Sequence, residues 1–236
     1  MRNEIAKHLD HDPHFEWRGQ NVTRLENLSD IVFALALGML LLTGAPPSNF
    51  GELIAFLVNI VPVAAAFAIL FGIWNAHFTF FRRYGLADTK IIVLNSILLL
   101  LVLFVAYPLR FIFDSLFGYV IFLISADPTR LMETDMDIVN SARSVAIFNA
   151  GYSVIIFLTS LMYQHALSKT EMLGLSENEQ RLTKRTIWSY RGEMMIAALT
   201  AVIAIATPLG PFAGGLLFLN WPNAIFWRKR FEITTN

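Results

Sequence analysis

The sequence contains no cysteine and few charged residues. The absence of cysteine excludes a disulfide framework and every metal site built on thiolate ligands, and it leaves the redox compartment open. Asp, Glu, Lys and Arg make up only 15% of the residues, whereas soluble globular domains carry about a quarter. Lys and Arg together number 18, as do Asp and Glu together, so the net charge is zero. We therefore predict no nucleic-acid partner and no strongly acidic substrate.

The motifs of an intramembrane enzyme are also missing. The chain has no G-x-S-x-G, no H-E-x-x-H and no pair of carboxylates within its apolar runs. It has no apolar run with arginine at every third position, which is typical of a voltage sensor. These absences predict a protein that is not an enzyme, with no catalytic residue, no resident metal and no cofactor.

Hydrophobic residues are abundant instead. They make up 56% of the chain, which includes 20 Phe, and the mean hydropathy is +0.55. This composition predicts a protein of the lipid bilayer. The first 27 residues are polar and have no apolar core, so they are not a cleavable signal peptide, and we expect them to stay on the protein in the cytoplasm.

Six apolar stretches predict an all-α integral membrane protein with six transmembrane helices. They cover about 28–45, 51–81, 91 to 113 or 116, 144–165, 194–208 and 211–227. Accordingly, we divide the chain into a cytoplasmic N-terminal segment, 1–22, and a six-span membrane domain, 23–236.

Three details refine these boundaries. Thr23 followed by Glu26 fits a capping box that begins the first helix, and Pro62 predicts a kink in the second. A third span extended past residue 116 would exceed the bilayer, so we expect a break near Asp114 or Gly118 and an outer loop or surface helix up to residue 142. The connector at 168–191 is predicted to be helical around 176–188.

The distribution of Lys and Arg predicts the topology. The chain up to residue 24 has four, 82–90 three, 169–191 five and 228–230 three, which places fifteen of the eighteen on one side. The other side has only Arg110, Arg130 and Arg143. Because cytoplasmic loops are enriched in these residues, both termini are predicted to be cytoplasmic.

This topology places three polar side chains at one depth near the cytoplasmic boundary: Asp30, His77 and Asn95. An ionisable side chain within a span costs about 2.5–3.5 kcal/mol on insertion scales. We expect Asp30 to accept hydrogen bonds from His77, Asn95, Ser29 or Arg24, which would offset that cost. A brace that joins three helices is our preferred interpretation, and a part in transport is the alternative.

The first span also carries an apolar stripe at helical spacing. Asp30 lies about 140° around the helix from Leu35, so the carboxylate faces away from the stripe. A stripe that faced a central axis would form an apolar conduit with hydrophobic constrictions, whereas core packing or lipid contact explains the same pattern. Its members are Leu28, Ile31, Leu35, Gly38, Met39 and Leu42.

The N-terminal segment contains His8, His11 and His14 at steps of three. On a helix these imidazoles would lie near one face and could bind a metal such as zinc. Spacing alone is weak evidence for a site, so we favour a solvated cytoplasmic helix or tail.

The first span, which opens with Arg24-x-x-x-Leu28-Ser29-Asp30, resembles a known signature. The motif has the spacing of the R-x-x-x-F-S-D signature of the transmembrane protein 175 family of potassium channels, with Leu28 in place of Phe. Further residues are similar to the second and third spans of that family: Trp74, His77, Asn95 and Tyr107-Pro108-Leu109. The resemblance covers about 24–110 and extends beyond that only through the six-span topology.

The resemblance implies a potassium channel without a carbonyl filter, a homotetramer in bacteria whose first helices line the pore. By position, Leu35 would form the narrowest hydrophobic ring, a hydrophobic gate, and Met39 and Leu42 would form further rings. Gly38 stands where the family commonly has Thr or Ser, which puts strong potassium selectivity in question. The bracing network would comprise Arg24, Ser29, Asp30, His77 and Asn95.

The expected partners are the lipid bilayer, further copies of the chain, and potassium ions or other monovalent cations or protons. The expected location is the bacterial inner membrane, as a multi-pass protein. The alternative function is a proton leak, or a proton-coupled secondary transporter, that uses Asp30 and His77 as a relay.

Overall fold

The computed structural model describes residues 15–41, 47–126, 129, 132 and 137–232, and within them every element is a helix. The elements are α2 (Arg24–Leu41), α3 (Phe50–Val58), α4 (Ile60–Tyr84), α5 (Thr89–Ser125), α7 (Ile138–Ser168), α8 (Thr170–Leu173), α9 (Glu177–Ala206), the 3₁₀ helix η1 (Gly210–Leu219) and α10 (Asn220–Arg230). The all-α class predicted from the sequence is confirmed for this part of the chain.

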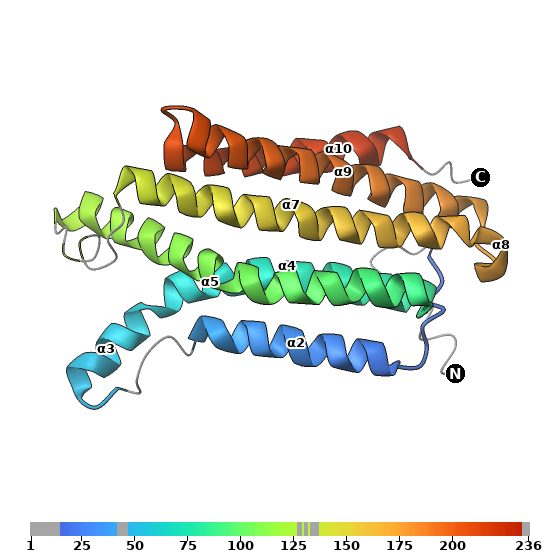
Figure 1. Cartoon of the computed structure of the whole chain (residues 1–236), viewed down its shortest axis with the longest axis horizontal. Helices are drawn as coiled ribbons and strands as arrows, with labels where there is room; N and C mark the ends of the chain where they lie inside the picture. Colours follow the sequence, from blue (N-terminus) through green and yellow to red (C-terminus); the bar gives the residue numbers. More distant parts are fainter. Residues whose placement is uncertain (1–14, 42–46, 127–128, 130–131, 133–136, 233–236) are drawn as a thin grey trace.

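The long helices lie side by side in an elongated bundle (Figure 1). Helix α2 packs against α4 and α5, and α7 packs against α5, α9 and η1. Helix α10 returns along α9. The main hydrophobic core joins α2, α4, α5 and α7, with Phe33, Leu70, Leu98 and Ile155 among its fully buried members.

Four helices of the described chain, α4, α5, α7 and α9, are long and apolar enough to cross a membrane. Helix α2 has 18 residues, and α10 has 11 and follows a 3₁₀ segment. The chain is therefore a multi-pass membrane protein.

The second predicted span is two helices in the structure. The sequence predicts one kinked helix over 51–81, but α3 ends at Val58 and α4 begins at Ile60, with Asn59 between them. Pro62 explains the position of the break, because its ring lacks an N–H for the Val58 carbonyl and crowds that carbonyl. Figure 1 shows α3 leaving the axis of α4 at an angle.

The break expected near Asp114 or Gly118 is wrong, because α5 continues for 37 residues to Ser125. The Arg110 Nε donates to Asp114 Oδ2 at 2.6 Å, one helical turn away, which supports the helix where the break was expected. The helix ends at Ala126, whose φ of 56° is left-handed. At a rise of about 1.5 Å per residue, a helix of this length extends well beyond the hydrocarbon core.

The connector helix predicted around 176–188 is confirmed, but it is continuous with the fifth span as α9. A capping box begins α9: Ser176 N–H donates to Glu179 Oε2 at 2.8 Å, and Glu179 N–H donates to Ser176 Oγ at 3.3 Å. Gly192 lies within the helix and leaves room for Asn223 of α10, because a Cβ at Gly192 would lie 2.1 Å from Asn223 Oδ1. The glycine therefore serves close packing of the two helices and does not end α9.

The last predicted span contains η1 followed by α10. Gly210, with a φ of 49°, makes the turn from α9, and Pro211 follows at the start of η1. The small residues of this region allow close approach to α9, since Ala213 is buried against Ala201 and Ala204.

Candidate pore helix and its polar contacts

Helix α2 begins with the capping box expected from the sequence. Thr23 N–H donates to Glu26 Oε1 at 2.9 Å, and Glu26 N–H donates to Thr23 Oγ1 at 3.2 Å. Two backbone N–H groups that lack helical partners are thereby satisfied, which fixes where the helix starts.

The two sides of α2 have different surroundings. Its buried residues are Glu26, Ser29, Phe33, Ala36 and Leu40, and they face α4 and α5. At 100° per residue, the apolar stripe lies on the opposite side of the helix. Leu28 is 53% exposed, Ile31 65% and Leu35 56%. Core packing within the subunit is therefore excluded as the explanation of these three positions.

The described C-terminal members of the stripe are less exposed to solvent than the first three. Gly38 and Met39 are half-buried, and Leu42 lies outside the described residues. A Cβ built on Gly38 would meet nothing within 4 Å. Position 38 therefore has space for a larger side chain within this subunit.

Three residues of the predicted network lie in one buried hydrogen-bonded chain. Ser29 Oγ donates to the Leu25 carbonyl at 2.8 Å and accepts from Asn95 Nδ2 at 2.9 Å. Asn95 Oδ1 lies 2.7 Å from His77 Nε2. Ser29 and Asn95 are 0% exposed and His77 is 3% exposed, so α2, α4 and α5 share a fully enclosed polar contact. Asn95 is its central member.

The partners expected for Asp30 are corrected by the structure. Asp30 is exposed, and its Oδ1 accepts from the Trp74 indole Nε1 at 2.8 Å. Ser29, one position away, points about 100° around the helix toward α5, whereas Asp30 points toward α4. Trp74 was part of the family resemblance, but no spacing or motif predicted that it would pair with Asp30.

Arg24 does not join the network in the described part of the chain. It is the first residue of α2 and is exposed. Arg24 and Asp30 are six positions apart, which places the two side chains about 120° apart on the helix.

A buried ion pair that the sequence did not predict holds the start of α2. Arg82 Nη2 of α4 bonds Glu26 Oε2, and Arg82 Nη1 donates to the Gly19 carbonyl at 2.7 Å. Glu26 is 5% exposed and Arg82 8% exposed. The sequence already gave both residues a role, Glu26 in the capping box and Arg82 as a topology marker, and it contained no signal that linked them.

The other end of α2 is held by an arginine from α5. Buried Arg110 donates from Nη1 to the Leu40 carbonyl at 2.8 Å, while its Nε bonds Asp114. Carbonyl groups in the last turn of a helix lack helical partners, and a guanidinium satisfies one here. In the sequence this arginine was only one of three basic residues on the outer side.

A further polar pair joins α7 and α9, where the Tyr152 hydroxyl donates to Glu193 Oε1.

The described residues include no group of three or more His, Asp or Glu that could hold a metal ion. His8, His11 and His14 lie outside the described residues, so the metal hypothesis for them stays untested.

Taken together, these contacts fix α2 at three levels along one side. The Glu26–Arg82 pair holds its first turn, Ser29 joins the buried chain, and Arg110 bonds the Leu40 carbonyl. The opposite side is apolar and exposed. These contacts hold α2 by one side and leave its apolar stripe available to further copies of the chain or to lipid.

Known proteins resemble this chain over nearly its full length. A family model described as endosomal/lysosomal potassium channel TMEM175 matches residues 24–106. A potassium channel from Marivirga tractuosa is 33% identical over 237 aligned residues, which cover 97% of this chain and 95% of the relative.

Two solved structures share the fold. A variant of the potassium channel MtTMEM175, in complex with a nanobody–MBP fusion protein, superposes with a TM-score of 0.80 at 30% identity and covers 94% of this chain and 98% of that one. A lysosomal potassium-selective channel TMEM175 homolog from Chamaesiphon minutus gives a TM-score of 0.51 at 21% identity, covering 89% and 97% of the two chains.

Proposed function

The chain belongs to the TMEM175 family of potassium channels, and from that premise we propose that it conducts potassium ions through a pore lined by α2 in a homotetramer. Members of this family are channels and not enzymes. The observation that carries the proposal is the division of α2 into a buried, hydrogen-bonded side and an exposed apolar side.

In the proposed tetramer, four copies of α2 surround the axis with their apolar stripes inward. Leu35 forms the narrowest ring, and Met39 and Leu42 form further rings. An apolar constriction controls ion passage because water leaves it readily, so a small change in its radius changes conduction. Gly38 has no hydroxyl, unlike the Thr or Ser that the family commonly has at this position. We therefore expect the preference for potassium over sodium to be modest.

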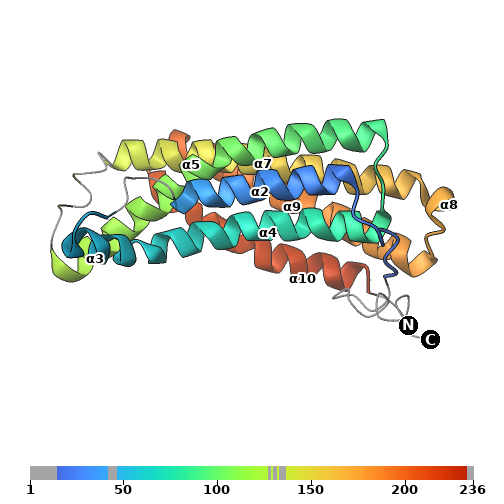
Figure 2. The ribbon, with the colours of Figure 1, turned by 90° about the horizontal axis from the view of Figure 1, so that it is seen from below.

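The proposed topology has six spans with both termini in the cytoplasm of a bacterial inner membrane. Two observations support it. Fifteen of the eighteen Lys and Arg residues fall on the predicted inner side. The start of α2 and the ends of α4 and α10 also lie at the same end of the bundle (Figures 1 and 2).

The buried chain of Ser29, Asn95 and His77 is proposed as the brace that holds α2 in position. A satisfied polar contact inside a membrane protein specifies one helix arrangement, because any other arrangement leaves a polar group without a partner. In this proposal Asp30 contributes through Trp74, at the edge of the brace.

A proton relay through Asp30 and His77 is not favoured by these contacts. Asp30 bonds Trp74 and His77 bonds Asn95, so within the described residues no hydrogen bond links Asp30 to His77.

Flux from proteoliposomes tests the proposal. Purified protein is reconstituted, and potassium, sodium, caesium and proton gradients are applied in parallel. We expect potassium flux that rises linearly with driving force. Saturating uptake with a fixed coupling ratio would reject a channel, and a reversal potential that follows pH alone would establish proton conduction instead.

A further inference from the structure

Residues 15–22, which we name the N-terminal strap, lie against the helix ends without being helical themselves. Phe15 is 1% exposed, and its ring meets the Tyr84 ring edge-on at 5.5 Å. The Arg83 guanidinium lies 4.5 Å from the centre of the Phe15 ring. Phe15 therefore anchors the start of the strap in the hydrophobic core.

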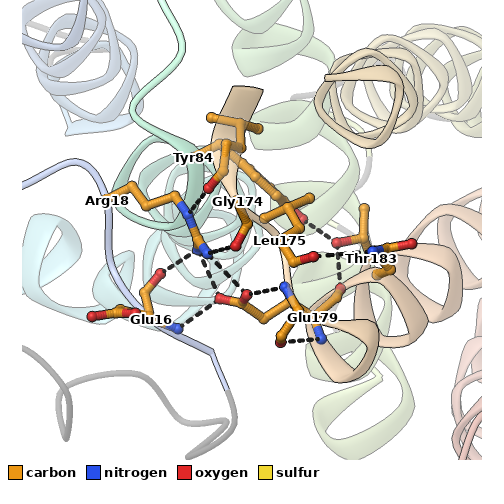
Figure 3. Close-up of polar contacts among 10 residues, drawn as sticks. Glu16, Arg18, Tyr84, Gly174, Leu175, Glu179 and Thr183 are labelled. Atoms are coloured by element: carbon orange, nitrogen blue, oxygen red, sulfur yellow. Dashed lines mark hydrogen bonds and ion pairs between the residues drawn. The ribbon is translucent and has the colours of Figure 1, made fainter. Parts of the chain in front are cut away.

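Arg18 of the strap uses all five of its N–H donors (Figure 3). Nε donates to the Leu173 carbonyl at 2.6 Å, and Nη1 donates to the Glu16 carbonyl at 2.9 Å. Nη2 donates to the Gly174 carbonyl at 3.1 Å. The two remaining donors form a paired contact with the Glu179 carboxylate, at 2.7 and 2.9 Å. Lysine has no planar fork and cannot reproduce this set.

Both carboxylate oxygens of Glu179 accept hydrogen bonds from more than one group. Besides Arg18, it accepts from the Glu16 N–H at 3.0 Å and from the Ser176 N–H at 2.8 Å. Only 5% of its side chain is exposed. Exposed ion pairs contribute little to structure, whereas this pair is largely buried, with 19% of the Arg18 side chain exposed, and its many hydrogen bonds fix the geometry of its elements. The pair joins residues 161 positions apart in the chain.

Gly19, the residue after Arg18, connects the strap to Arg82 of α4 and through it to α2. Gly19 N–H donates to the Arg82 carbonyl at 3.0 Å, and the Gly19 carbonyl accepts from the Arg82 guanidinium. A Cβ at Gly19 would lie 2.2 Å from the Phe81 carbonyl oxygen, so only glycine allows this approach. Arg82 in turn bonds Glu26 in the first turn of α2.

These contacts form one continuous path from α9 to the start of the pore helix. It runs from Glu179 through Arg18 and Gly19 to Arg82 and then to Glu26. Helix α2 packs on α4 and α5, and α9 packs on α7, η1 and α10, so the strap bridges parts of the bundle that α2 itself does not reach.

We propose that Arg18 and Glu179 form a clamp that positions the N-terminal end of α2 for conduction. The proposal rests on the proposed function, since it gives these positioning residues a role in a pore lined by α2. When the clamp is broken, the strap releases Arg82, and the first turn of α2 loses its fixed orientation toward the pore axis.

Potassium flux from proteoliposomes provides the first test. Glu179→Gln keeps the shape of the side chain but places an amide against donors that need an acceptor, and Arg18→Lys keeps the charge but not the fork. We expect each variant to reduce potassium flux per tetramer about fivefold, which corresponds to a change of roughly 1 kcal/mol in the population of the conducting arrangement. The matched control is Glu177→Gln, an exposed carboxylate in the same first turn of α9, with flux equal to wild type. Clamp variants that conduct like this control would overturn the proposal.

A second test does not depend on conduction. Because the chain has no cysteine, Leu28→Cys introduces a single thiol on the stripe near the start of α2. Its rate of modification by a soluble thiol reagent is measured on the folded tetramer isolated by size exclusion, with and without Glu179→Gln. We expect the rate to change about fivefold when the clamp is broken. An unchanged rate would show that the pair only stabilises the fold, and this result would be informative even if the wild-type protein carried no potassium flux.

Discussion

Adjacent residues in the first turns of α2 have separate structural roles. Ser29 is fully buried and bonds Asn95, whereas Asp30 is exposed and bonds Trp74. Leu28, on the other side, is exposed in the stripe. A helix rotates by 100° per residue, so three consecutive positions meet three different environments. Substitutions of neighbouring residues are therefore expected to have different consequences.

Leu35→Ala is expected to increase potassium flux several-fold, because loss of the branched side chain widens the narrowest apolar ring and lowers the cost of wetting it. Flux per reconstituted tetramer is the measurement. Leu41→Ala is the matched control, since Leu41 is also exposed on α2 but lies about 120° away from Leu35 around the helix. Equal flux in the two variants would place the constriction elsewhere.

His77→Ala is expected to destabilise the protein by about 1–3 kcal/mol, because the buried Asn95 Oδ1 loses its partner. Thermal unfolding in detergent measures the loss. Asp30→Asn is the control and should change stability by no more than about 0.5 kcal/mol, because an amide oxygen can still accept from Trp74. If Asp30→Asn proved the more damaging substitution, the brace would centre on Asp30 after all.

At the scale of the helices, the close crossing of α5 and α7 joins the two sides of the bundle. Gly151 of α7 faces Val105 of α5, and a Cβ at Gly151 would lie 2.5 Å from Val105 Cγ2. Val105 is β-branched and has little freedom to rotate away. The crossing distance therefore depends on the missing side chain at position 151.

Gly151→Ala is expected to destabilise the fold by roughly 1–3 kcal/mol, because α5 and α7 must move apart. Gly72→Ala in α4 is the control, since a Cβ there meets nothing within 4 Å and alanine favours a helix by about 0.5–1 kcal/mol. Melting temperatures in one detergent compare the pair. A Gly151 variant as stable as wild type would mean that the helices tolerate a wider crossing.

Asp88 connects the start of α5 to the end of α7. It caps α5 by accepting from the Ile91 N–H at 3.0 Å, and its Oδ2 lies 2.6 Å from His165 Nε2. Burial acts to raise the pKa of the Asp88 carboxyl, but the hydrogen bonds from His165 and Ile91 outweigh it, and the pKa lies below its ordinary value of 3.8. The ionised carboxylate therefore stabilises the folded state above that value, and the contribution is lost as the pH falls through the lowered pKa.

Asp88→Asn keeps a capping side chain and removes the charge. At neutral pH the variant should be less stable than wild type by up to about 1 kcal/mol, a small value because the carboxylate is partly exposed. The difference should shrink as the pH is lowered below 3.8, which thermal unfolding at pH 7 and at acid pH would show. A difference that grew on acidification would contradict the assigned direction.

At the scale of the whole molecule, the structure places the basic helix ends together. The ends of α4 and α10 and the start of α9 lie at one end of the bundle (Figure 2). The strap joins α4 to α9, and the Trp188 ring of α9 stacks on the Trp227 ring of α10 with the ring centres 5.3 Å apart. Arg82, Arg228, Lys229 and Arg230 lie in the last turns of α4 and α10. This arrangement agrees with a single cytoplasmic face.

Single cysteines in the cysteine-free chain can test the six-span topology with a reagent that does not cross membranes. Introduced at Asn21, Lys90 and Lys229, they should react only after intact cells are permeabilised. Ser48→Cys and Leu209→Cys should react without permeabilisation. In the six-span topology position 48 follows α2, and position 209 lies between α9 and the span formed by η1 and α10, so both face the outside. If positions 21 and 48 reacted from the same side, α2 would not span the membrane and could not line a pore.

The sequence by itself determined the features that depend on local pattern. Hydropathy gave the membrane class and all-α fold, the Thr23–Glu26 spacing gave a capping box that the structure confirms, and the Arg24–Asp30 motif pointed to the family. Such features arise from residues within a few turns of one another, so their signal is present in the chain order.

Only the tertiary structure decided which side chains meet. It paired Asp30 with Trp74, Glu26 with Arg82 and Arg18 with Glu179, and it continued α5 past Asp114. These partners depend on the rotation and separation of packed helices, which a shift of one residue in register would change completely. Hydropathy and spacing are nearly insensitive to that shift, and for this reason the sequence could name most members of the polar contacts but not their pairing.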